Sequence, residues 1–572
     1  MASDRRAFLG VCSAFGVAAT LLPGVLWSEI QKRAVARVTR EMIDDAAVVA
    51  GLEIADEHKA SMVRGLNEQL DGFEQIRQLK LDNDAAPALL FDPVLEQGTV
   101  PTEKIPARMS RLAALAVPAA VEQLAFASVR QLAELLRTGR VSSTSLTEMY
   151  LTRLKRYDSL LHFVITLCHE RAMVQARQAD EEIALGKYRG PLHGVPWGAK
   201  DLLSVKGYPT TWGADWLRAQ QFDEDASVVQ RLDAAGAVLV AKLSLGTLAM
   251  GGDEWFGGMT RNPWNPEQGA SGSSAGSASA VAAGCVGFAI GSETLDSISS
   301  PAARCGATGL RPTFGRVART GAMALCWSLD KIGPICRTVE DCALVLGAIN
   351  GADGKDRTAR EVPFNWDATL DVRALRVAYL EGEFEREGRG IGDGQESERQ
   401  RLERRRIDRA ALDVIRGLGV KTTPVQLPRL PWRAMLTIPK AEAAATFEEI
   451  TRSGSGRLLA QQQRDWPTTF RVGRFIPAVD YINANRARVR GMQALGRIFE
   501  DFDVIAAPTN SVQLIMTNLT GHPAVIFPNG FREDGTPSSL TLVGDLFGEA
   551  RMLALAGAYQ ELTNWHTRTP RL

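Results

Sequence analysis

Three short stretches carry the residues whose chemistry stands out in this sequence. Lys200 ends the apolar run of GPLHGVPWGAK, where burial would lower the pKa of a lysine enough for its amine to accept a proton. Ser273 and Ser274 lie in SGSSAGS, and Ser297 lies in GSETLDSISS. Small residues let backbone N–H groups approach a ligand, and serine hydroxyls supply nucleophiles and proton carriers. One interpretation is therefore a relay in which the lysine deprotonates one serine through another.

The second stretch also matches the G-x-S-x-G pattern of a nucleophile elbow, at Gly272 to Gly276. That pattern needs a buried strand before the serine, but the preceding TRNPWNPEQGAS is rich in proline and asparagine. A Ser-His-acid triad also needs a histidine, and His522 and His566 are candidates only by elimination. Both points disfavour this alternative.

Composition excludes several other classes of function. The 66 basic and 66 acidic residues cancel, which removes the positive surface that a nucleic-acid partner would require. The seven cysteines and six histidines are scattered, without metal-ligand spacing. We expect no metal site and no nucleic-acid partner, and we interpret the cysteines as small buried apolar residues.

The elements that must position these residues alternate in type after Ser128. Ser128 and Ser142 are expected to cap two amphipathic helices. Beyond them, helical patterns alternate with the apolar runs GAVLVAKLSLG, LRVAYLEGEF and FDVIAAPTN, which favours an α/β architecture with a central sheet. The charged run between Glu381 and Ala410 is interpreted as a solvated loop or helix face.

The segments before residue 128 have different patterns. Residues 1–36 contain the pair Arg5-Arg6 and then no charge between Ala7 and Ser28, which resembles a twin-arginine export signal, with an N-terminal membrane anchor as the alternative. This predicts a periplasmic protein that contacts the membrane only through this segment. Residues 37–82 show helical spacing and are expected to form a helical appendage, and the proline-rich residues 83–127 an extended linker.

The ordered series of motifs resembles the amidase signature family, hydrolases with a serine, cis-serine and lysine triad. The matching segments, in family order, are GPLHGVPWGAKD, DASVVQRLDAAGAVLVAKLSLGTLAMG, RNPWNP, SGSSAGSASAVAAG, GSETLDSISSPAARCGATGLRPTFGRV, SLDKIGP and NLTGHPAVIFPNG. The resemblance implies a single large α/β domain over 128–572, with a central mixed twisted sheet flanked by helices. It also implies that no cofactor is needed.

Carried over by position, the resemblance assigns a role to each candidate residue. Lys200 would be the general base, Ser273 the bridging serine after a cis peptide bond, and Ser297, 24 positions later, the acyl-forming nucleophile. Ser274 would support the relay by hydrogen bonding. The oxyanion hole would be formed by the backbone N–H groups of Thr294, Leu295, Asp296 and Ser297. The implied reaction is hydrolysis of a non-peptide linear carboxamide through an acyl-enzyme.

The nucleophile segment departs from the family pattern. The usual Gly-Gly-Ser-Ile-Arg is replaced by Leu295-Asp296-Ser297-Ile298-Ser299, and Glu293 replaces the usual aspartate. A carboxylate one residue before the nucleophile would oppose a developing oxyanion unless it points away or is neutralised.

Three functions remain open at this level. The first is an exported amide hydrolase acting on a small-molecule amide, with a homodimer as the default assembly. The second is a catalytically impaired homologue that acts in binding, which Asp296 motivates. The third is the glutaminase subunit of a tRNA-dependent amidotransferase. The appendage has a weak likeness to the small helical subunit of those enzymes, in IDDAAVVAGLEI and NEQLDGFE.

Overall fold

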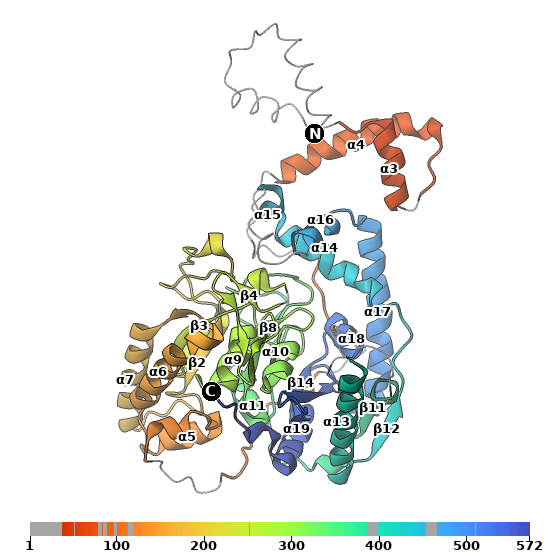
Figure 1. The fold of residues 1–572 in the computed structure, drawn as a ribbon. Helices are drawn as coiled ribbons and strands as arrows, with labels where there is room; N and C mark the ends of the chain where they lie inside the picture. The colour runs from red at the N-terminus through yellow and green to blue at the C-terminus, as the bar shows by residue number, and fades with distance from the viewer. Residues whose placement is uncertain are drawn as a thin grey trace, which may run out of the picture. The chain divides into compact units, whose positions relative to one another are not determined.

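The computed structural model describes residues 37–50, 52–77, 83, 88–95, 100–112, 119–250, 252–385, 397–453, 466–509 and 511–572 (Figure 1). The export signal expected in residues 1–36 lies outside the described residues. By its contacts the chain forms two compact units, Met1–Asp82 and Asn83–Leu572. The segment 83–127, which we expected to be a linker, is therefore counted with the large unit.

The described residues of the small unit form two helices, α3 (Arg40–Ala50) and α4 (Asp56–Arg77). A lysine joins them: Lys59 Nζ lies 2.6 Å from Asp44 Oδ1 on α3 and 2.5 Å from Asp56 Oδ1 on its own helix. These are the helices that the pattern between residues 37 and 82 predicts.

An 11-stranded mixed sheet forms the centre of the large unit. In spatial order its strands are β1 (Val164–Leu167), β3 (Val238–Leu243), β2 (Pro196–Lys200), β8 (Phe288–Glu293), β10 (Lys331–Cys336), β9 (Thr308–Arg311), β14 (Ala524–Phe531), β15 (Pro537–Gly544), β13 (Val504–Pro508), β11 (Val377–Leu380) and β12 (Thr422–Val425). The strands β3, β11 and β13 coincide with the three apolar runs noted above. The prediction of an α/β fold with a central mixed sheet is confirmed.

The strands that matter for the candidate site are neighbours. Strand β2 pairs in parallel with both β3 and β8, and β10 pairs antiparallel with β8. In that last pair, Lys331 lies opposite Glu293. The carboxyl ends of β2 and β8 and the start of β10 therefore meet at one edge of the sheet.

Helices cover both faces of the sheet, as the alternation of side chains along β8 shows (Figure 1). Phe288 and Ile290 belong to one apolar cluster, which includes residues of α11, whereas Ala289 belongs to another with residues of α9. Residues that alternate along a strand face opposite sides of the sheet. The helices of this half are α5 (Val129–Arg137), α6 (Ser143–Leu161), α7 (His169–Ala184), α8 (Ser227–Ala234), α9 (Ala275–Ala282), α10 (Ser299–Cys305) and α11 (Val339–Ile349).

The expected caps are present. Ser128 closes a capping box with Gln131 at the start of α5, and the Ser142 hydroxyl accepts the Ser145 N–H at the start of α6. The last part of the charged run, from Glu398 to Ala410, lies in the helix α13 (Glu398–Gly417). A helix is one of the two structures that we expected for this run.

The C-terminal half adds the remaining helices. Besides α13 they are α12 (Glu381–Phe384), α14 (Thr437–Thr446), α15 (Glu448–Ser453), α16 (Trp466–Gly473), α17 (Ala478–Asp501), α18 (Gln513–Thr520) and α19 (Glu549–Thr563).

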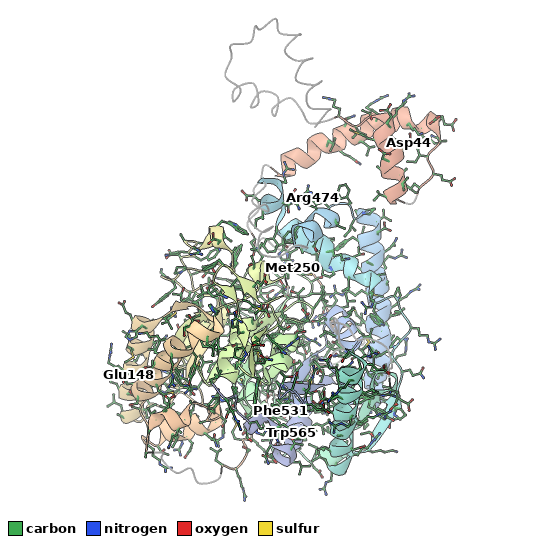
Figure 2. All side chains as sticks on the ribbon, viewed as in Figure 1. Asp44, Glu148, Met250, Arg474, Phe531 and Trp565 are labelled. Carbon is green, nitrogen blue, oxygen red and sulfur yellow. The ribbon has the colours of Figure 1, made fainter. Side chains whose placement is uncertain are left out.

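A fully buried ion pair between Arg316 and Glu549, with a length of 2.8 Å, joins α19 to the loop after β9. At the end of β14, the ring of Phe531 packs against those of Trp264 and Trp565. Figure 2 labels Phe531 and Trp565, which lie next to each other. None of the helices in the described residues combines the length and apolar composition that a bilayer crossing requires.

Candidate active site

Lys200 is placed by the alternation of residues along β2. Trp197 and Ala199 belong to the apolar cluster that includes residues of α11, so Gly198 and Lys200 face the side of α9. The start of α9 follows Ser273 and Ser274 directly. The last residue of a buried strand therefore points its amine at the N-terminal end of a buried helix.

The Lys200 amine is completely buried and surrounded by serine oxygens. Its Nζ lies 2.8 Å from Ser273 Oγ, 2.9 Å from Ser274 Oγ and 3.0 Å from Ser292 Oγ, and donates to the Ser292 carbonyl at 3.4 Å. Among the described residues, no carboxylate lies within ion-pair distance of this amine. Its neighbour Asp201 pairs with Lys242 instead, at 2.7 Å.

Burial lowers the pKa of Lys200 to about 7. Loss of hydration disfavours the charged form of an amine, and the more distant carboxylates of Asp330, Glu293 and Asp296 oppose this loss only in part. A lysine with this pKa is partly neutral near pH 7 and can accept a proton from a neighbouring hydroxyl.

Two glycines make room for the serines. The peptide bond between Gly272 and Ser273 is cis, as the resemblance implied. A Cβ at residue 272 would overlap the carbonyl oxygen of Gly252, so only glycine fits there. A Cβ at Gly291 on β8 would lie 2.8 Å from Ser274 Oγ. The glycine therefore lets Ser274 approach β8, where its hydroxyl donates to the Ser292 carbonyl at 3.1 Å.

Ser297 lies in the loop between β8 and α10 and is 4% exposed. The loop is joined to the other serines through the backbone, since Ser274 N–H donates to the Ser297 carbonyl at 3.0 Å. In the described part of the chain, the N–H groups of Leu295 and Ser297 donate to no other protein group. Free N–H groups beside a serine hydroxyl are suited to hold a negative oxygen.

Glu293 fixes the position of this loop through hydrogen bonds. Its Oε2 accepts the N–H groups of Ile298 and Ser299 at 2.9 and 2.8 Å, and its Oε1 accepts hydrogen bonds from Arg311 and Asn518 at 2.8 and 2.9 Å. Burial acts to raise the pKa of the Glu293 carboxyl, but Arg311 and Asn518 hold it below its usual value. Glu293 is thus a fully bonded structural carboxylate.

Asp296 differs from Glu293 in its surroundings. The Ser300 N–H on α10 donates to the backbone carbonyl of Asp296 at 2.8 Å, and the Ser300 hydroxyl acts to lower the pKa of the Asp296 carboxyl. Burial and the nearby charge of Glu293 raise the pKa of Asp296 to about 7. Near neutral pH a large share of this carboxyl is therefore uncharged, which reduces its repulsion of a developing oxyanion.

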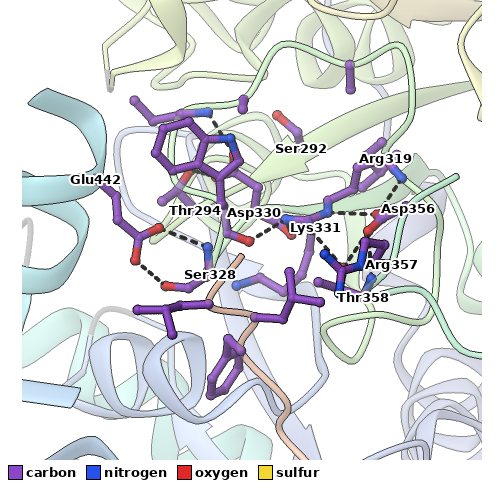
Figure 3. A pocket seen from close by; sticks show the side chains of 18 of the residues that line it. Ser292, Thr294, Arg319, Ser328, Asp330, Lys331, Asp356, Arg357, Thr358 and Glu442 are labelled. Atoms are coloured by element: carbon purple, nitrogen blue, oxygen red, sulfur yellow. Dashed lines mark hydrogen bonds and ion pairs between the residues drawn. The ribbon is translucent and has the colours of Figure 1, made fainter. Parts of the chain in front are cut away.

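The serines open into a cavity of about 1210 Å³ (Figure 3). Ser273, Ser292, Thr294 and Ser297 all line it. Two of the lining residues, which Figure 3 labels, contact each other: Thr294 Oγ1 donates to Asp330 Oδ1 at 2.6 Å. The other walls come from residues 319–332, residues 355–358, α14 and α17.

One wall of the cavity comes from residues 89–92 and Leu95, in the segment we expected to be a linker. The Phe91 ring packs edge-on against Phe314, with ring centres 5.0 Å apart, and the Arg488 guanidinium lies 3.4 Å above its centre. Asp92 forms an ion pair with Arg360. Residues well before the motif series therefore take part in shaping the cavity.

The sequence-predicted residues are brought together to different degrees. Lys200, Ser273 and Ser274 are in direct hydrogen-bond contact, and Ser297 lines the same cavity. Sequence reasoning missed the contact of Ser292 with Lys200 and the structural role of Glu293. The sequence signal for both was the presence of Ser292 and Glu293 shortly before the candidate nucleophile Ser297.

The nucleophile-elbow alternative is not supported by the surroundings of Ser274. Its hydroxyl contacts Lys200 and Ser292, and the strand that precedes it, β7 (Asn265–Gly269), belongs to a separate two-stranded sheet. His522 is fully buried, stacks on Phe499 and has a pKa lowered by burial to about 3. The described cysteines are buried and unpaired, as expected.

Comparison with known proteins identifies the family. The model of the Amidase family matches residues 145–517. The chain belongs to the amidase signature family. A glutamyl-tRNA(Gln) amidotransferase subunit from Roseiflexus castenholzii is 35% identical over 495 residues, which cover 78% of this chain and 97% of that relative.

Solved structures with 28–29% identity have the same fold. The native peptide amidase from Stenotrophomonas maltophilia has a TM-score of 0.65 and 29% identity, covering 79% of this chain and 99% of its own. A structure from a vestigial protein complex, related to the origins of an s-triazine catabolic enzyme, has a TM-score of 0.68 and 28% identity, covering 76% and 98%. These relatives are matched over nearly their whole length, whereas about a fifth of this chain lies outside the matched part.

The bonding of Glu293 predicts a large stability loss for Glu293→Gln. Every group around this carboxylate is a donor, so the amide nitrogen of glutamine would face another donor and Arg311 would lose its buried counter-charge. We expect a loss of about 3–5 kcal/mol in the free energy of unfolding, measured by urea denaturation.

A matched control is Glu134→Gln, which breaks the more exposed ion pair of Glu134 with Arg137. It should cost less than about 1 kcal/mol. Equal effects of the two substitutions would show that Glu293 does not hold the nucleophile loop in the way described.

Proposed function

We propose that this amidase-family protein hydrolyses the C–N bond of a small, non-peptide linear carboxamide, with Lys200 as general base, Ser273 as proton bridge and Ser297 as nucleophile. One observation carries the proposal: a completely buried lysine amine, with a pKa of about 7, contacts Ser273 in the cavity that Ser297 also lines. A base with a pKa near the working pH combines a useful neutral fraction with sufficient basicity.

The reaction then proceeds in two halves. Lys200 accepts the proton of Ser273 as Ser273 takes that of Ser297, and the Ser297 oxygen forms a bond to the amide carbon. The backbone N–H groups from Thr294 to Ser297 hold the resulting oxyanion. The C–N bond breaks, and the proton returns through Ser273 to the departing amine. Water, activated by the same route, releases the carboxylic acid from Ser297.

A second candidate is a glutaminase that supplies ammonia to an amidotransferase, and the 35% identity to an amidotransferase subunit favours it. The two candidates differ in their substrates. A glutaminase of this kind should release ammonia from L-glutamine much faster than from simple aliphatic or aromatic amides. We expect the opposite order, with kcat/KM for the best small amide that lacks an α-amino group at least about 10-fold above that for glutamine. Measured ammonia release decides between them.

The role of Ser297 predicts a specific covalent adduct. A fluorophosphonate should label the purified protein at Ser297, located by peptide mass spectrometry, because the activated hydroxyl displaces fluoride from phosphorus. Lys200→Ala should slow this labelling at least about 100-fold, since a general base typically contributes that much. Lys206→Ala, which removes an exposed lysine paired with Asp223, should label at the wild-type rate. Labelling at another serine, or equal rates in all three proteins, would contradict the assigned roles.

The pKa of Lys200 predicts the pH dependence of kcat/KM. Only the neutral amine accepts a proton, so the rate should rise with pH through about 7 and then level off. Asp296 has a pKa in the same range and its charge stabilises the Lys200 ammonium, so the two groups share the observed transition.

Asp296→Asn removes that negative charge and should move the rising limb to lower pH, because the pKa of Lys200 falls. The comparison of the two pH profiles also tests the view that Asp296 impairs catalysis. A wild-type rate that falls between pH 6 and 8, and that Asp296→Asn restores, would show that the ionised Asp296 carboxylate opposes the oxyanion.

A further inference from the structure

Lys331 is a buried lysine at the edge of the cavity that the proposed mechanism does not use. It begins β10, lies opposite Glu293 of β8 in the sheet, and is 3% exposed. It lines the same cavity as Ser273 and Ser297. Its chain neighbour Asp330 contacts Thr294, three residues before Ser297. Figure 3 shows Asp330 and Lys331 together in the middle of the cavity wall.

The Lys331 amine has no hydrogen-bond partner among the described residues. The other fully buried lysines of the large unit differ in this respect. Lys200 is surrounded by serine oxygens, and Lys242 contacts Asp201, the Thr210 hydroxyl and the Pro209 carbonyl at 2.7 to 2.8 Å. An unpaired buried ammonium is strongly unfavourable, so it calls for a partner.

The carboxylates near Lys331 are already occupied by other donors. Glu293 accepts from Arg311, Asn518 and two backbone N–H groups. Asp330 accepts from Thr294 on one oxygen and from the N–H groups of Leu325 and Cys326 on the other. Neither carboxylate lies within ion-pair distance of the Lys331 amine in the described structure.

The charges that face Lys331 favour an added anion. They are Glu293 on β8, Arg311 on β9, Asp330 on the same chain segment and Arg488 on α17. When the Lys331 amine is protonated, this group holds three cationic side chains and two carboxylates. Burial and the charge of Arg311 lower the pKa of Lys331 well below its usual value, which an anion beside it would reverse.

We propose that Lys331 binds a carboxylate of the substrate, so that the amide cleaved at Ser297 carries a free carboxylate a few bonds from the scissile C–N bond. The ammonium has three N–H donors and matches a singly charged, two-oxygen acceptor. We place the bound carboxylate a few bonds from the scissile C–N bond because Asp330, the chain neighbour of Lys331, contacts Thr294 in the loop that carries Ser297. The cleavage part of this inference rests on the proposed function, whereas the binding part does not.

The main experiment compares matched amides that differ in one charge. Succinamate, glutaramate and adipamate are each paired with the simple alkyl amide of the same chain length, and ammonia release is measured. N-acetylglycine and N-propylacetamide form a pair with the charge on the amine side, measured by acetate release. In the wild type, kcat/KM should favour the acid at least about 10-fold in one of these series, because a hydrogen bond to a charged group is lost in the neutral partner.

Lys331→Met keeps much of the side-chain volume and removes the charge. It should abolish the preference for the acid mainly through a higher KM, while kcat/KM for the neutral amides stays within about 3-fold of wild type. Lys331→Arg should retain part of the preference. Lys206→Met, which removes an exposed lysine that is paired with Asp223 and does not line the cavity, is the matched control and should keep all of it. An acid preference that is absent from the wild type, or unchanged in Lys331→Met, overturns the inference.

A binding measurement separates this inference from the proposed function. Glutarate and adipate are titrated by calorimetry into Ser297→Ala and into Ser297→Ala/Lys331→Met. Binding to the first protein at least about 10-fold tighter than to the second supports the carboxylate site even if no amide is cleaved and Ser297 is not labelled. Equal binding, or none to either protein, overturns it. Thermal melts of both proteins check that they are folded.

Discussion

The site depends on a lysine amine buried without a carboxylate in contact. Strand β2 ends at Lys200, and the strand alternation points this side chain at the start of α9, where only hydroxyl and carbonyl oxygens meet it. Such oxygens stabilise an ammonium less than a paired carboxylate would, so burial lowers the pKa of Lys200 to about 7. Lys242, on the neighbouring strand β3, differs because it pairs with Asp201. The same end of the sheet can therefore also hold a lysine with a buried counter-charge.

The carboxylate at the end of β8 has the opposite role. Glu293 is used entirely for structure, because Arg311, Asn518 and the first N–H groups of α10 occupy both of its oxygens. Its contribution to the chemistry is therefore indirect: it fixes the loop that carries Ser297, and its charge raises the pKa values of Lys200 and Asp296. The loss of one partner from this network would strongly lower the free energy of unfolding, as is typical of buried ion pairs.

Much of the fold and part of the site could be predicted from local patterns. Ser128 and Ser142 cap helices because capping depends on a few neighbouring residues, and the apolar runs became β3, β11 and β13. The contact of Ser292 with Lys200 and the burial of Lys331 could not be predicted in this way. Both result from the pairing of β8 with β2 and β10, which joins residues far apart in the chain.

The unusual residues of the cavity can be understood through one charge balance. Asp296 places a carboxyl in the loop where we propose that an oxyanion forms, a position at which an added negative charge is unfavourable. Its pKa of about 7 removes part of that charge near neutrality. Lys331, on the strand beside the loop, adds an amine that the neighbouring carboxylates do not pair and whose pKa burial lowers. A substrate carboxylate bound there would favour the protonated amine and pair with it. An acid in the loop and an unpaired lysine beside it therefore fit together in a cavity adapted to an anionic amide.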